Sequence, residues 1–213
     1  AHPPKSIFLL FALLVASIVA SAAKLRLPGV HGTMSVGFLV VLVCVSKVSL
    51  IEAMTVMGSG TIVQCLWNAR TTPRAIQVVF SVCNSIAATG FSYMLGKQLL
   101  QFFDGSLVAE LMGATICYFF LISFPIAAIL NLTEGRPLIH TWKETYVWSF
   151  PYFILGTAMV GTLIYLQENV GWQALVFIVP LIIGVYLVYG VYIRRLEAEK
   201  NQVEEMATLH LRT

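Results

Sequence analysis

The sequence predicts an all-α protein: a polytopic bundle of about seven transmembrane helices with a C-terminal cytoplasmic helical stalk. Of its 213 residues 58% are hydrophobic and only 11% are charged, whereas an ordinary soluble domain is about 25% charged. The mean hydropathy is +0.84, and apolar residues run along nearly the whole length. This composition excludes a disordered chain, a collagen-like chain and a disulfide-stapled secreted domain.

Charged residues and helix breakers separate seven apolar runs. In order they cover residues 6–23, 33–46, 49–67, 76–96, 107–131, 147–167 and 172–193. A helix needs about 20 apolar residues to cross a bilayer core of about 30 Å, and the second run has only about 14, which give about 21 Å. Residues 33–67 therefore form either two spans or one re-entrant hairpin with Lys47 and Glu52 at its turn.

The first run ends in small residues, as a secretory signal peptide does. Its apolar stretch is longer than a signal core, and Lys24 and Arg26 follow at once. Both features favour a membrane span held by cytoplasmic charges over a cleaved signal.

The distribution of basic residues predicts the orientation. A cytoplasmic C-terminus places ten of the 13 Lys and Arg residues inside and leaves only Lys5, Lys47 and Lys97 outside. Cytoplasmic loops carry an excess of Lys and Arg, so this orientation is favoured. We expect a multi-pass protein of the cytoplasmic membrane whose first helix begins outside, which leaves room for a further helix upstream of residue 1.

The seventh run continues beyond the membrane as an uninterrupted helical pattern. Steps of three and four residues give a leaky heptad seam, in which the apolar positions are Ile193, Leu196, Val203 and Ala207. We expect a parallel two-helix stalk in a homodimer, the alternative being a solvated helical tail. The predicted domains are a transmembrane bundle over residues 1–193 and a signalling helix over 194–213. The pattern has no stop signal, so we expect a longer polypeptide with a C-terminal output domain.

Two stretches carry a resemblance to known families. Residues 204–213, EEMATLHLRT, resemble the lead-in to bacterial HD-GYP domains, which are metal-dependent cyclic-di-GMP phosphodiesterases. The stretch LRLPGV at 25–30, Ser35 before an apolar helix, and a helix from near Glu52 to QCLWN at 64–68 resemble the MASE group of bacterial membrane-associated sensor domains. The resemblance implies a sensor of the bacterial inner membrane that controls cyclic-di-GMP turnover. No HD-GYP metal ligand lies within these residues.

Polar side chains inside apolar runs are the candidate ligand-binding residues, because each costs free energy in the bilayer unless it has a partner. The candidates are Glu52, Gln64, Asn68 and Asn84. The alternative for Glu52 is an interfacial pair with Lys47, and the alternative for the amides is hydrogen bonding between helices.

Two further features have structural interpretations. Glu110 is expected to be an exposed carboxylate at a helix start, favoured by the helix dipole. The polar loop at 132–146 is expected to touch the stalk or to form a short interfacial helix anchored by Trp142.

Other chemistry is not indicated. We find no nucleotide-binding, hydrolase or metalloprotease motif, so we expect no enzyme activity in this chain and no cofactor. His31, His140 and His210 each stand alone, and the four cysteines lie in apolar runs without a CxxC pair, so we assign no metal. With 13 basic and 10 acidic residues, the charge balance is too even for a nucleic-acid-binding domain.

Three functional hypotheses remain. The first is an input module that senses a small ligand, a lipid or a membrane state and relays it through the last helix. The second is a small transporter or substrate-binding membrane component, which would have no use for that helix. The third is an accessory subunit of a larger membrane complex.

Overall fold

The computed structural model describes residues 7–22, 24–26, 33–35, 37–67, 73–135 and 137–169. The chain divides into two compact units, residues 1–26 with 30–162 and residues 27–29 with 163–213. The described part of the second unit is residues 163–169, the last turns of a helix that begins in the first unit.

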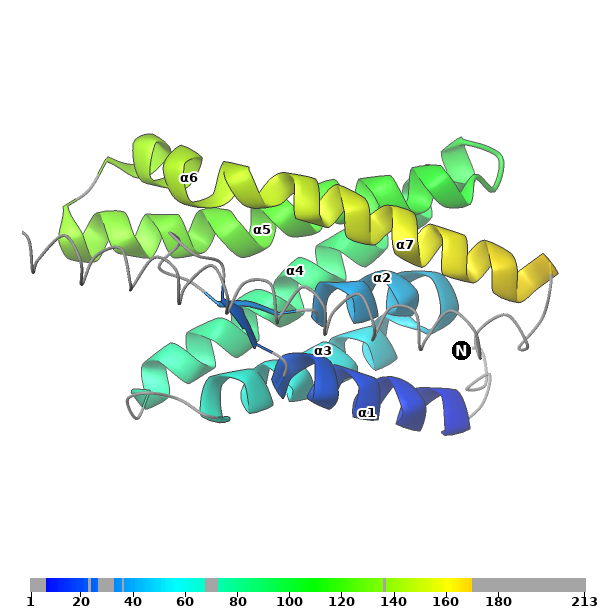
Figure 1. Cartoon of the computed structure of the whole chain (residues 1–213), viewed down its shortest axis with the longest axis horizontal. Coiled ribbons are helices and arrows are strands. Elements are labelled where there is room, and N and C mark those ends of the chain that lie inside the picture. The colour runs from blue at the N-terminus through cyan, green and yellow to red at the C-terminus, as the bar shows by residue number, and fades with distance from the viewer. Residues whose placement is uncertain are drawn as a thin grey trace, which may run out of the picture. The chain divides into compact units, whose positions relative to one another are not determined.

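The described elements confirm the helical class (Figure 1). In chain order they are α1 (Ile7–Ala22), β1 (Lys24–Arg26), β2 (Thr33–Ser35), α2 (Gly37–Lys47), α3 (Leu50–Leu66), α4 (Ala75–Phe102), α5 (Leu107–Glu134), α6 (Leu138–Tyr146), the 3-10 turn η1 (Val147–Ser149) and α7 (Phe150–Asn169). The prediction lacked the antiparallel pair of β1 and β2, in which Leu25 lies opposite Met34.

Among the helices that the structure describes, three are long and apolar enough to cross a membrane. Their spans, Ala75–Phe102, Leu107–Ile129 and Phe150–Asn169, correspond to the predicted runs at 76–96, 107–131 and 147–167. The first three predicted runs correspond to the shorter apolar helices α1, α2 and α3. The seventh run and the seam residues Ile193, Leu196, Val203 and Ala207 lie outside the described residues.

Large apolar side chains face outward from these helices. Phe11 on α1 is 65% exposed, and Ile76 and Phe91 on α4 are 75% and 60% exposed. Monomeric soluble proteins rarely expose so much apolar surface, whereas lipid tails cover it in a bilayer. The exposed apolar side chains are therefore consistent with a protein that lies in a membrane.

The helices α2 and α3 are both short. The 11 residues of α2 give a length of about 16 Å, against a bilayer core of about 30 Å. Val48 and Ser49 link the two helices. Glu52 caps the start of α3, because its carboxylate accepts hydrogen bonds from the Ser49 N–H at 2.8 Å and from the Ser49 hydroxyl at 2.7 Å.

Two sets of helix contacts hold the first unit together. In one, α1, α2 and α3 pack against each other, and in the other α4 packs against α3 and α5. Leu13, Cys44 and Val56 are buried in the first of these, and the Ser17 hydroxyl donates to the Val56 carbonyl at 3.0 Å. A Cβ at Gly60 would collide with Ser17, so the small residue permits the close approach of α1 and α3. The helix α4 lies between α3 and α5 (Figure 1).

Glu110 lies in the first turn of α5, as expected, but the expectation that it is exposed is wrong. Its side chain is 2% exposed, and the Lys97 ammonium donates to its Oε1 at 2.6 Å. The turn between α4 and α5 contains Asp104 and Gly105, whose φ angles are 49° and 84°. Because the hairpin is antiparallel, residues about equally far from this turn face each other, and this geometry brings Lys97 onto Glu110.

Candidate ligand pocket

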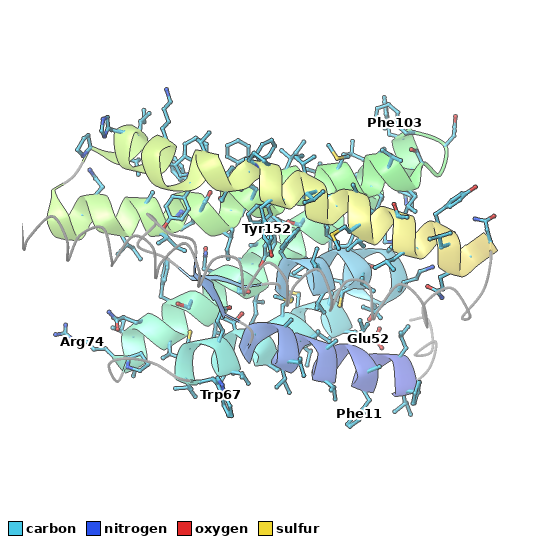
Figure 2. All side chains as sticks on the ribbon, in the orientation of Figure 1. Phe11, Glu52, Trp67, Arg74, Phe103 and Tyr152 are labelled. Carbon is cyan, nitrogen blue, oxygen red and sulfur yellow. The ribbon has the colours of Figure 1, made fainter. Side chains whose placement is uncertain are left out.

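A pocket of about 370 Å³ opens within the first unit, at the end where α3 finishes and α4 begins. Small-molecule sites commonly have volumes of about 300–1,000 Å³. Residues from α2, α3, α4, α5, α6, η1 and the start of α7 line it. Figure 2 shows Glu52 and Trp67 at opposite ends of α3. The pocket lies toward the Trp67 end, since Gln64 and Cys65 are among its lining residues.

One wall of the pocket is polar and comes from α3 and α4. Its members are Thr61, Gln64, Ser81, Asn84 and Ser85. Thr61 and Ser85 are already paired, since their hydroxyl oxygens are 2.9 Å apart. The half-buried side chains of Gln64, Ser81 and Asn84 have no hydrogen-bond partner within the described part of the chain. An unpaired amide in apolar surroundings costs free energy, so these groups favour a bound partner.

A second wall is aromatic and comes from α2, α5 and α7. Phe38 lies at the centre, with ring centroids 4.6 Å from Phe153 and 5.1 Å from Tyr152. Phe119 extends the wall, at 5.2 Å from Phe153. Such tilted and edge-on pairs are the favoured aromatic geometries. The rings are therefore held in place and present a rigid apolar surface.

The segment from α6 to η1 contributes Tyr146 and Ser149 to the pocket. The predicted short helix around Trp142 is present as α6, and its place at a membrane interface stays a prediction. The Trp142 indole N–H donates to the Ser123 hydroxyl at 3.0 Å, and its ring stacks on Phe120 at 5.5 Å. Burial raises the pKa of the Tyr146 phenol above its ordinary value. A phenol is neutral at physiological pH even without this shift, so the group offers a neutral hydrogen-bonding partner.

The structure brings together two of the four predicted ligand-binding residues. Gln64 on α3 and Asn84 on α4 line the same pocket. Glu52 is not among the lining residues and caps α3 instead. Asn68 lies outside the described residues. That Gln64 and Asn84 bind a ligand stays a prediction.

Sequence reasoning missed the other lining residues. Ser81 had an available signal, because it stands three residues before Asn84 and so shares its helix face. Thr61 stands in the same relation to Gln64. The aromatic wall had no such signal, since Phe38, Phe119 and Phe153 belong to three helices far apart in the chain.

The described residues that line the pocket are polar, aromatic or aliphatic. None of these described lining residues is Lys, Arg, Asp or Glu. Within the described ranges, no three His, Cys, Asp or Glu side chains come together in a group able to hold a metal ion. Comparison with models of protein families, with curated proteins and with solved structures finds no match to this chain.

Proposed function

We propose that this chain is the membrane-embedded input module of a signalling protein. It binds a small ligand in the pocket between α3, α4 and the aromatic wall, and it relays the bound state through its last helix to a cytoplasmic output domain. The observation that carries the proposal is the pocket itself, which is lined by three unpaired polar side chains and by a rigid aromatic wall.

The proposed signal passes along the chain from the pocket through α7 to the predicted last helix. Tyr152 and Phe153, in the first turn of α7, line the pocket. The chain runs from α7 into the predicted last span and then into the predicted stalk. A ligand that repositions α7 therefore acts on the element that leads directly to the stalk, and it biases a two-state packing there if it binds one state more tightly.

The predicted topology and the resemblance support the rest of the proposal. In the predicted topology of about seven spans with a cytoplasmic C-terminus, the stalk lies in the cytoplasm, and its heptad seam favours a homodimer. The resemblance of residues 204–213 to the lead-in of HD-GYP domains, and of residues 25–68 to MASE sensors, favours control of cyclic-di-GMP turnover by the output domain.

Disulfide crosslinking in native membranes tests the relay. After replacement of the four native cysteines, Leu196→Cys, Val203→Cys and Ala207→Cys should crosslink, whereas the outward controls Glu197→Cys and Asn201→Cys should not. Filling the pocket then mimics ligand binding. We expect Ser81→Trp to change the crosslinking yield at Val203→Cys.

The matched control for pocket filling is Val79→Trp, which adds the same side chain to an outward position of α4 that is 60% exposed. It should leave the yield unchanged. A seam that crosslinks equally with and without Ser81→Trp would contradict the relay. Absent seam crosslinks would replace the relay with the transporter or accessory-subunit hypothesis.

A further inference from the structure

We infer that the ligand of this pocket is an uncharged planar ring that carries carbonyl or hydroxyl oxygens. The inference rests on the proposed function, because it names the chemical class that the same pocket would bind. Three properties of the described lining residues carry it: they hold no charge, they include a rigid aromatic wall and they include unpaired amides.

The uncharged lining disfavours ionic ligands. Among the residues that the structure describes, no Lys, Arg, Asp or Glu lines the pocket, and a charge transferred into such surroundings without a partner is strongly disfavoured. The ion pair of Lys97 and Glu110 cannot serve as a counter-charge, because its two groups satisfy each other. Lys97 is also 13 residues beyond Asn84 on α4, which corresponds to about 20 Å along the helix.

The aromatic wall selects a ring. Phe38, Tyr152 and Phe153 hold each other through centroid distances of 4.6 to 6.0 Å. A planar ligand gains offset or edge-on contacts with such rings beyond the burial of its area. Because the rings are fixed before binding, little side-chain freedom is lost when the ligand enters.

The polar wall selects oxygen substituents. The amide of Gln64 or of Asn84 offers both N–H donors and a carbonyl acceptor, and the Ser81 hydroxyl offers either role. A ring carbonyl would accept from an amide N–H, and a ring hydroxyl would donate to an amide oxygen. Gln64 lies on α3 and Asn84 on α4, so a ring with two oxygens would be held from two helices at once.

The native cysteines provide a reporter for binding. Cys65 lines the pocket, whereas Cys83 is an exposed residue of α4 that does not. We would keep only Cys65, or only Cys83 as the matched control, and measure alkylation by a small membrane-permeant maleimide. The probe is a fully substituted benzoquinone, which has no free ring position for thiol addition, both with and without a decyl tail.

Both quinones should slow alkylation of Cys65 and leave Cys83 unaffected. Protection by the tailed form at much lower concentration would indicate a ligand from the bilayer, and equal protection a ligand from the aqueous phase. Gln64→Leu and Asn84→Leu should each weaken protection about fivefold, the effect of one lost hydrogen bond. The control Gln98→Leu removes an exposed amide of α4 outside this pocket and should leave protection unchanged.

Two further probes decide against the proposal if they succeed. The alcohol n-decanol keeps the tail and an uncharged oxygen but has no ring, and para-decylbenzoate keeps the tail and the ring but adds a charge. Protection of Cys65 by either one as strong as that by the quinone would overturn the ligand class, and so would the absence of protection by the quinones. The relay is judged separately, since Ser81→Trp alters or spares the stalk crosslink whatever the ligand is.

Discussion

The two polar clusters on α4 lie in similar apolar surroundings but differ in their partners. Near the end of the helix, Lys97 donates to the nearly inaccessible Glu110 of α5 at 2.6 Å. Near its beginning, Ser81 and Asn84 face a pocket and have no hydrogen-bond partner within the described part of the chain. In the first, which we call the closed cluster, Lys97 and Glu110 join α4 to α5 and satisfy each other. In the second, which we call the open cluster, the donors and acceptors of Ser81 and Asn84 are unused.

This difference separates a structural role from a binding role. A polar group inside a bundle is retained either because a neighbouring helix satisfies it or because something outside the chain does. Substitution should therefore have opposite effects at the two places. Removing a partner from the closed cluster should destabilise the protein, and removing an unpaired group from the open cluster should not.

The largest expected effect is at the closed cluster. Lys97→Met leaves the Glu110 carboxylate, which is 2% exposed, without a counter-charge. The pair is half-buried, since Lys97 is 30% exposed. Removing one partner of a fully buried pair costs about 3 kcal/mol or more, so we expect the free energy of unfolding to fall by about 2 to 3 kcal/mol here. Titration with sodium dodecyl sulfate in detergent micelles, followed by circular dichroism, measures it.

The double variant Lys97→Met with Glu110→Leu is the control. Replacing both charges by apolar side chains of similar size is often neutral or stabilising, so most of the lost stability should return. A single variant as stable as the parent chain would show that the pair does not hold the hairpin.

A smaller effect is expected on the aromatic wall. A Cβ at Gly156 would collide with the Phe38 ring and lie 2.7 Å from Leu39 Cδ2, and Phe38 is 4% exposed and cannot move away freely. Gly156→Ala should lower the free energy of unfolding by about 1 to 2 kcal/mol, because overpacking outweighs the gain in helix propensity.

The matched control for this change is Gly161→Ala on the same helix. There the nearest atom is Leu111 Cδ1 at 3.5 Å, an ordinary contact. This substitution should raise the free energy of unfolding by up to about 1 kcal/mol. Equal effects at the two glycines would mean that Phe38 is not held as tightly as its contacts indicate.

The smallest effect is expected at the open cluster. Asn84→Leu should leave the free energy of unfolding unchanged or raise it by up to about 1 kcal/mol, since no hydrogen bond is lost. Thr115→Val is the control at a paired site, because Thr115 and Thr157 lie 2.6 Å apart through their hydroxyl oxygens. It should cost about 1 kcal/mol, and a comparable loss in Asn84→Leu would indicate a helix partner for Asn84.

The long helices could be predicted from the sequence, because the length of an apolar run indicates a membrane-spanning helix. The runs at 76–96 and 107–131 match α4 and α5 because long apolar stretches between charged turns have few alternatives. The strands β1 and β2 have three residues each, which is too short for an alternating pattern to stand out. The expected exposure of Glu110 was wrong, because a position at a helix start indicates exposure only when no facing helix carries a partner.

The site could be predicted only in part, for a similar reason. Gln64 and Asn84 are noticeable in the sequence because amides are unusual within apolar runs. Phe38 and Phe153 are not noticeable, because aromatic residues are common there and only the fold brings these two together. A single sequence shows which residue types are unusual in an apolar run, but it does not show which side chains they contact in the fold.

The central claim is that the polar faces of α3 and α4 enclose a pocket open to small molecules. The rate of Cys65 alkylation in native membranes tests it most directly, in chains that keep this cysteine alone. We expect Ser81→Trp to slow the reaction several-fold by filling the space beside Cys65, and Val79→Trp, on the outward face, to leave the rate unchanged. An equal rate in all three chains would contradict the account, because Ser81 and Cys65 would then not share a pocket.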